Sequence, residues 1–268
     1  MNKAYFFLST GRCGTQWMTD YLSKSLIGKA RVWHEPLQSE YNSRHNITTT
    51  SIDNLPLEVQ SHLENIDKML AYSSYFECGH PSWGCIPALI NHFGKSIKII
   101  QIVRHPIPTA MSWLTHSAYV PPLLPHLKEK VLIAPDDSGV NYPHIKDQWA
   151  NMSPFDKCIY YWMEINTFGK VWQASQNVPW LTIKFEEMFS QDGLQELHDF
   201  IELEHNSMNP EFFNKSVDQF KYITNEEVNF DAVQHNSNLK ALCDHYGYNI
   251  TDIQLDELQQ RYTGQIIK

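Results

Sequence analysis

Two arginines, each placed after a run of apolar residues, are the side chains of this sequence with the most evident chemistry. Arg12 lies in "STGRCGT", residues 9–15, directly after the apolar run 5–8. Arg104 follows "SIKIIQIV", residues 96–103. Because the planar guanidinium group donates two hydrogen bonds at once, arginine is well suited to holding a phosphate group. Both positions are therefore candidate anion sites.

The segment around Arg12 has the composition of a phosphate-binding turn. A strand that passes through a short loop into a helix leaves backbone N–H groups free at the positive end of that helix. Gly11 and Gly14 allow the backbone to approach a phosphate closely, and Thr10 and Thr15 add hydroxyl donors. A nucleotide kinase would carry G-x-x-x-x-G-K-[ST] here, whereas this loop is shorter and has no lysine. An ordinary turn with two chance glycines is the alternative interpretation.

Arg104 is followed by a stretch that predicts a second anion site. Pro106 suits the first turn of a helix that continues through Ser112. Because a helix rises 1.5 Å per residue, Pro106 and Ser112 lie roughly 9 Å apart, and Arg104 and Ser112 can reach one phosphate. A surface arginine and a solvent-exposed serine are the alternative.

Short apolar runs alternate with helical periodicity along the chain, which predicts a parallel sheet covered by helices on both faces. After about residue 190 the pattern is mainly helical. The fold class is therefore α/β, with one domain over residues 1–268 and two long loops, 38–54 and 134–154, that are candidate lids. Strands are expected at 4–8, 30–34, 75–78, 96–103 and 178–185, and helices at 15–27, at 59–70 and at 155–175.

Composition narrows the classes of function. The net charge of −9 argues against nucleic acid or a long polyanion as partner, because such proteins carry a broad basic surface. The 5 cysteines form no C-x-x-C pair and the 13 histidines no H-E-x-x-H motif, so we expect reduced thiols and no metal site. With no signal peptide and no apolar stretch of spanning length, we expect a cytoplasmic protein without a membrane span.

Four motifs, in order along the chain, resemble those of the PAPS-dependent sulfotransferases. "STGRCGTQW" at 9–17 resembles their 5′-phosphosulfate loop, and "IVRHPIPTAMSWL" at 102–114 resembles their 3′-phosphate motif. "WLTIKFEEM" at 180–188 and "LCDHYGYNI" at 242–250 are similar to later family segments. The resemblance covers about 250 residues and implies a P-loop NTPase-like α/β fold. It also implies that the donor is 3′-phosphoadenosine 5′-phosphosulfate (PAPS) and that no metal is needed.

The resemblance also assigns roles to residues. Arg104 and Ser112 would hold the 3′-phosphate, and Arg12 would stabilise charge on the leaving oxygen. Cys13 and Gln16 stand where the family usually has serine and threonine, so contacts from these two side chains are in doubt. The residues that would surround the 5′-phosphosulfate are Thr10, Gly11, Arg12, Cys13, Gly14, Thr15, Gln16 and Trp17.

Two residues are candidates for the base that accepts the proton of the attacking group. Glu35 follows the second expected strand and His80 the third. Both positions resemble those of catalytic bases in branches of the family. Because Arg12 matches the branch with an arginine in the loop, Glu35 is slightly favoured, but the choice stays open.

The sequence thus predicts transfer of a sulfuryl group from PAPS to a hydroxyl or amine of a small-molecule, sugar or lipid acceptor. A P-loop kinase acting on a small molecule is one alternative, although it would need a lysine that the loop does not have. A nucleotide-binding relative without catalytic activity is the other.

Overall fold

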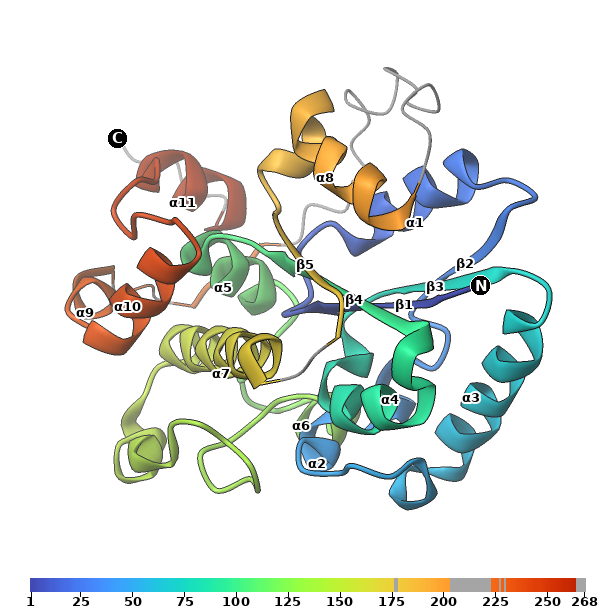
Figure 1. Cartoon of the computed structure of the whole chain (residues 1–268). Coiled ribbons are helices and arrows are strands. Elements are labelled where there is room, and N and C mark those ends of the chain that lie inside the picture. Colours follow the sequence, from blue (N-terminus) through green and yellow to red (C-terminus); the bar gives the residue numbers. More distant parts are fainter. Residues whose placement is uncertain (176–177, 203–222, 227, 229, 264–268) are drawn as a thin grey trace.

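A parallel sheet forms the centre of the molecule in the computed structural model, which describes residues 1–175, 178–202, 223–226, 228 and 230–263. Its strands are ordered β2-β3-β1-β4-β5, and every neighbouring pair is parallel. Figure 1 shows helices packed on both faces of this sheet. The strands are β1 (Ala4–Ser9), β2 (Ala30–His34), β3 (Ser74–Cys78), β4 (Ile97–Val103) and β5 (Trp180–Lys184).

Alternating side chains of β1 explain why helices cover both faces. Phe6 and Leu8 pack into one buried apolar cluster, whereas Tyr5 and Phe7 pack into the other. The first cluster takes in residues of α3 (Leu57–Leu70), α4 (Ile86–Phe93), α5 (Pro106–Leu114) and α7 (Pro154–Ser175). The second takes in residues of α1 (Thr15–Ser25) and α8 (Gln191–Ile201). Because a strand turns successive side chains to opposite faces, a fully apolar β1 requires cover on both sides.

The helices agree with the periodicity of the sequence where the expected helix is long. The helix expected at 155–175 is α7, and the one at 59–70 lies within α3, whose buried residues Val59, Leu63 and Ile66 form one face. The longer helices are α1 (Thr15–Ser25), α3 (Leu57–Leu70), α4 (Ile86–Phe93), α5 (Pro106–Leu114), α7 (Pro154–Ser175), α8 (Gln191–Ile201), α10 (Ser237–His245) and α11 (Leu255–Thr263). The shorter ones are α2 (Ser43–Asn46), α6 (Pro125–Lys130) and α9 (Phe230–Gln234).

Three sequence expectations need correction. The segment 134–154, expected as a loop, contains 3₁₀ turns at Pro143–Asp147 and Trp149–Asn151. The helix expected at 15–27 ends at Ser25, because Leu26 leaves the helical conformation. The segment 38–54, expected as a loop, contains two 3₁₀ turns, Gln38–Tyr41 and Ile52–Asn54, and the short helix α2. Helical pieces of three to five residues are too short to show a hydrophobic period.

The two segments expected as lids contact each other. Arg44, in the first segment, pairs with Asp137, in the second, with 2.8 Å between Nε and Oδ2. The ring of His45 also reaches the carbonyl of Glu129, which precedes the second segment, at 2.9 Å. The two segments are therefore in contact, and their action as lids stays a prediction.

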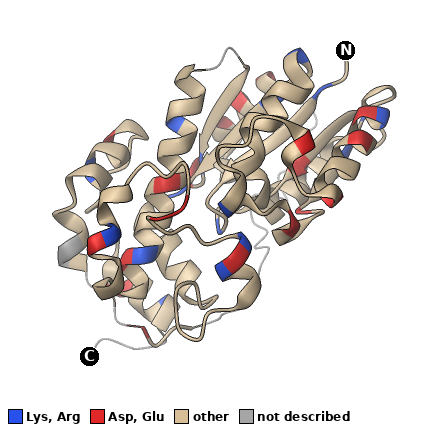
Figure 2. Ribbon diagram, turned by 90° about the horizontal axis from the view of Figure 1, so that it is seen from below, with Lys and Arg blue, Asp and Glu red and all other residues tan. Residues whose placement is uncertain are grey.

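Charged residues of both signs are interspersed over the part of the chain that the structure describes. In Figure 2, positions of Lys and Arg lie close to positions of Asp and Glu on several elements. This distribution agrees with an anion site that is local and does not extend along a basic surface.

Candidate active site

The carboxyl ends of four strands bring the expected site residues to one edge of the sheet. The loop 10–14 follows β1, Glu35 follows β2, His80 lies just after β3 and Arg104 follows β4. In the strand order, β2 and β3 lie on one side of β1 while β4 and β5 lie on the other. Such a switch in direction beside a central strand is where open α/β sheets bind their ligands.

The loop after β1 has the left-handed backbone of a tight anion-binding turn. Gly11, Arg12 and Gly14 all have positive φ, at 72°, 57° and 73°. A Cβ on Gly11 would lie 2.9 Å from the ring of Trp113 and 3.1 Å from Cγ of His80. Glycine is therefore required at position 11, because two aromatic rings pack against its backbone.

The N-terminus of α1 is open to an anion. Gly14 is the N-cap residue, and no side chain in the described part of the protein caps the helix. The N–H groups of a first helical turn have no partner within the helix and carry the positive end of its dipole. A phosphate or sulfate group can accept hydrogen bonds at this place.

The buried side chains of the loop maintain its shape. The hydroxyl of Thr10 and the thiol of Cys13 lie 3.2 Å apart, and the thiol donates to the carbonyl of Gly11 at 3.1 Å. Burial raises the pKa of Cys13 to about 11, so the group is a neutral thiol at neutral pH. Trp17 is buried and stacks on Tyr21, with 5.3 Å between ring centroids.

Other side chains of the loop have different surroundings. Gln16 is exposed, whereas Thr15 is buried and its hydroxyl lies 3.2 Å from Nε2 of His34. Contact of the residues from Thr10 to Trp17 with a donor molecule stays a prediction.

Arg12, Arg104 and Ser112 come together through hydrogen bonds. Arg104 donates from Nη1 to the carbonyl of Arg12 at 2.8 Å, and Arg12 donates from Nε to the hydroxyl of Ser112 at 3.0 Å. The two arginine sites that the sequence predicts therefore lie side by side, with the serine of α5 beside them.

Arg104 is a buried cation that forms no ion pair with the residues that the structure describes. Its side chain lies on the ring of Phe185, 4.4 Å from the centroid, and only 8% of the residue is exposed. Its Nε has no hydrogen-bond acceptor in the described part of the chain. Because a buried charge is costly without a counter-charge, Arg104 is prepared to receive an anion.

Glu35 and His80, which the sequence offers as alternatives, form one hydrogen-bonded pair. Oε1 of Glu35 lies 3.0 Å from Nδ1 of His80 and 3.4 Å from its backbone N. A Cβ on Gly79 would overlap the side chain of Glu35, so the glycine before His80 allows this approach. The structure thus assigns the two residues to a single unit.

The surroundings of Glu35 make its carboxyl group strongly acidic. Burial by itself raises the pKa of Glu35, but this effect is outweighed by the charge of His80, by hydrogen bonds from His80 and by the charge of His34. The net result is a pKa of about 2. The carboxylate is ionised at neutral pH and is a weak base.

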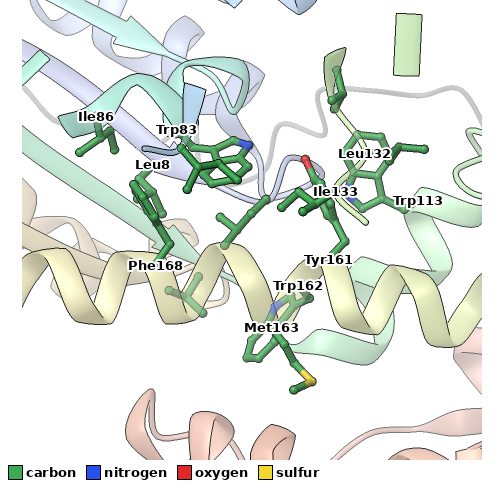
Figure 3. Close-up of a cluster of buried hydrophobic side chains, with 14 of the residues drawn as sticks. Leu8, Trp83, Ile86, Trp113, Leu132, Ile133, Tyr161, Trp162, Met163 and Phe168 are labelled. Atoms are coloured by element: carbon green, nitrogen blue, oxygen red, sulfur yellow. The ribbon is translucent and has the colours of Figure 1, made fainter. Parts of the chain in front are cut away.

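The other ring nitrogen of His80, Nε2, is buried and has no hydrogen-bond partner within the described ranges. The ring meets Trp113 edge-on at 5.5 Å, and Trp113 meets Tyr161 in the same way at 5.5 Å. Figure 3 shows Trp113 and Tyr161 in one apolar cluster with Trp83, beside α7. In the tautomer with its proton on Nδ1, which donates to Glu35, the ring of His80 presents the lone pair of Nε2.

Sequence reasoning missed several contacts of this site. Trp113 donates from its indole to the carbonyl of Thr10 at 2.8 Å, and Phe185 lies below Arg104. Both lie close to expected site features, since Trp113 directly follows Ser112 and Phe185 ends the strand expected at 178–185. Tyr262, whose hydroxyl accepts from Nη2 of Arg104 at 3.3 Å, lies 158 residues away in the sequence and gave no signal.

Among the residues that the structure describes, no three side chains of His, Cys, Asp or Glu come together in a way that could hold a metal ion. None of their helices is both long and apolar enough to cross a membrane.

This chain is similar to one protein family and to several solved structures. The family model described as "Sulfotransferase domain" matches residues 3–250. No curated protein gives a significant match. A solved sulfotransferase domain from the curacin biosynthetic pathway is similar at a TM-score of 0.52 and 13% identity, covering 93% of this chain and 99% of that one.

Two other solved structures are similar at TM-scores below 0.5. Mouse sulfotransferase SULT7A1 in complex with PAP is 17% identical, with a TM-score of 0.45, and the match covers 88% of this chain and 68% of that one. A sulfotransferase from Alicyclobacillus acidocaldarius is 13% identical, with a TM-score of 0.46 and coverage of 91% and 96%.

Proposed function

The chain belongs to the sulfotransferase domain family, and on this basis we propose that it transfers a sulfuryl group from PAPS to a hydroxyl or amine of a small-molecule acceptor. The observation that carries the choice of donor is Arg104, a buried cation without an ion pair in the described part of the chain. It lies beside Arg12 and the open N-terminus of α1. PAPS has two anionic groups, the 5′-phosphosulfate and the 3′-phosphate. The two arginine sites are equal to them in number and opposite in charge.

Donor binding divides between these two sites. The N-terminus of α1 and Arg12 would hold the 5′-phosphosulfate, and Arg104 with Ser112 would hold the 3′-phosphate. ATP lacks that 3′-phosphate, and its triphosphate is normally held through magnesium and a lysine that this loop does not contain. The kinase alternative is disfavoured for the same reason.

His80 is the proposed base, and Glu35 is the residue that positions it. The acceptor oxygen attacks sulfur while the bond between sulfur and the bridging phosphate oxygen breaks, and the proton of the acceptor passes to Nε2 of His80. Glu35 holds Nδ1–H and so keeps the lone pair on Nε2. Arg12 stabilises the charge that develops on the leaving phosphate, because a guanidinium group cannot supply a proton at neutral pH. We propose His80 over Glu35, which the sequence slightly favoured, because a carboxylate with a pKa of about 2 is a weak base.

The aromatic surroundings of His80 serve the same reaction. Trp113, which contacts the ring of His80 edge-on, is 5% exposed, and Tyr161, which contacts Trp113, is 1% exposed. Excluding water from Nε2 prevents transfer of the sulfuryl group to water in place of the acceptor.

Calorimetric titration of 3′-phosphoadenosine 5′-phosphate (PAP), without metal, tests the proposed donor. We expect the wild type to bind PAP more tightly than ADP, or ATP with magnesium. Arg104→Ala should weaken PAP at least about tenfold, because a buried hydrogen bond to a charged group contributes roughly 1.5–3 kcal/mol. Arg31→Ala, which removes an exposed arginine of β2, is the matched control and should change nothing. Tighter binding of ATP with magnesium than of PAP would contradict the proposal.

A further inference from the structure

The C-terminal helix α11 contributes a side chain to the surroundings of Arg104. We propose that the hydroxyl of Tyr262 is a ligand of the 3′-phosphate and helps the site to select 3′-phosphorylated adenosine nucleotides. This inference rests on the proposed function, since it concerns the same donor.

Tyr262 is the one residue of α11 that is buried. It is 6% exposed, on a helix that otherwise carries partly or fully exposed side chains. Its carbonyl accepts a hydrogen bond from the backbone N of Thr224 at 2.8 Å, which fixes the end of the helix. In Figure 1, α11 lies next to α5, the helix that carries Ser112. The sequence therefore places a single tyrosine inward, toward the arginine site.

The hydrogen bonding of this tyrosine is incomplete. Nη2 of Arg104 donates to its oxygen at 3.3 Å. A phenol is a donor as well as an acceptor, and the proton of Tyr262 meets no acceptor in the residues that the structure describes. Nε of Arg104, on the same guanidinium group, is likewise buried without an acceptor there.

Two adjacent buried donors without acceptors indicate what the site binds. Buried polar groups are nearly always hydrogen-bonded in folded proteins, so an unsatisfied pair points to a missing acceptor. A phosphate group has several oxygens that accept and none that must donate at neutral pH. A single phosphate can accept hydrogen bonds from both Arg104 and Tyr262. A ribose 3′-hydroxyl has one uncharged oxygen and is a weaker acceptor for each of these donors. The pair thus favours 3′-phosphorylated nucleotides over their 3′-hydroxyl counterparts.

Titration of two nucleotides that differ only in this phosphate, PAP and AMP, isolates the contribution of the hydroxyl. Tyr262→Phe retains the buried ring and removes only the oxygen. We expect its Kd for PAP to rise about tenfold and its Kd for AMP to stay at the wild-type value. Tyr246→Phe is the matched control. It removes another buried C-terminal hydroxyl, which bonds to Asn166 and Gln101 in the core. We expect the ratio of the two Kd values to be unchanged in this control.

The possible outcomes separate this inference from the proposed donor. If the wild type binds PAP more tightly than AMP and Tyr262→Phe shows the same ratio of the two Kd values, the inference is wrong while the proposed donor stands. Equal weakening of PAP and AMP would also overturn the inference, because Tyr262 would then merely hold α11 in place. If the wild type binds PAP no better than AMP, the proposed donor fails and this inference fails with it. Thermal unfolding of the variant verifies that it is folded during the titration.

Discussion

The pairing of Glu35 with His80 leads to the most specific prediction of this structure. Glu35→Gln keeps the shape of the side chain and removes its charge. The new amide can donate a hydrogen bond to Nδ1 of His80, which moves the ring proton to Nε2. Nε2 then has no lone pair to take the proton of the attacking group. Because general-base catalysis contributes about 10²–10⁴-fold, we expect kcat to fall by roughly this factor. The KM for the donor should stay near that of the wild type, since Arg12 and Arg104 are intact.

The same substitution has a cost in stability that can be worked from the pKa of Glu35. The pKa lies at about 2 in the folded protein against an ordinary value of 4.5. At about 1.36 kcal/mol per unit, ionised Glu35 stabilises the fold by up to about 3 kcal/mol in the pH range where His80 carries its charge. Because the pKa is lowered by folding, this contribution is complete above pH 4.5 and is lost as the pH falls toward 2. Denaturant unfolding should therefore show a gap in unfolding free energy between wild type and Glu35→Gln at about pH 5 that falls to less than half at about pH 3.

Kinetics of the double variant distinguish a positioning residue from a base. If Glu35 acts through His80, then His80→Asn loses as much activity as Glu35→Gln combined with His80→Asn, because residues that act as one unit are not additive. The assay is sulfuryl transfer to an acceptor identified by mass-spectrometric screening. The reasoning is refuted if His80→Asn retains activity that Glu35→Gln has lost, since Glu35 would then be the base.

Two further predictions concern the loop after β1. Gly11→Ala should lower the unfolding free energy by about 1–3 kcal/mol more than Gly28→Ala, measured in denaturant, since both have positive φ but only the Cβ at 11 meets Trp113. An equal loss in the two variants would show that contact with the ring does not matter. Cys13 should resist iodoacetamide at pH 8 in the folded protein and react in urea, followed by mass spectrometry, because burial raises its pKa to about 11. Rapid labelling of the folded protein would contradict the buried, neutral thiol.

The fold was predictable from the sequence where a buried strand or helix is long enough to show a clear hydrophobic period. The strand expected at 96–103 is β4, and the helix expected at 155–175 is α7, because both are long enough for periodicity to identify them. The segment 38–54 was not predictable, since its helical pieces depend on tertiary contacts such as the ion pair of Arg44 with Asp137.

The part of the site that lies at strand ends was predictable from the sequence. Arg12 and Arg104 follow buried strands, and parallel strands place their carboxyl ends at one edge, so their proximity follows from the sequence. The bond between Glu35 and His80 does not follow, because a sequence gives position along a strand but no distance across strands. The contact of Tyr262 with Arg104 depends on the path of the chain over 158 residues, for which no local pattern exists.

The central claim, sulfuryl transfer from PAPS, is tested most directly by following the sulfur. Wild-type protein is incubated without metal with PAPS that carries a labelled sulfate and with a panel of small alcohols, phenols and amines. We predict that label appears on one class of acceptor, with one PAP formed for each labelled product, and that His80→Asn abolishes this transfer. Equal amounts of PAP and inorganic sulfate with no labelled acceptor, or a phosphorylated acceptor with ATP and magnesium, would contradict the account.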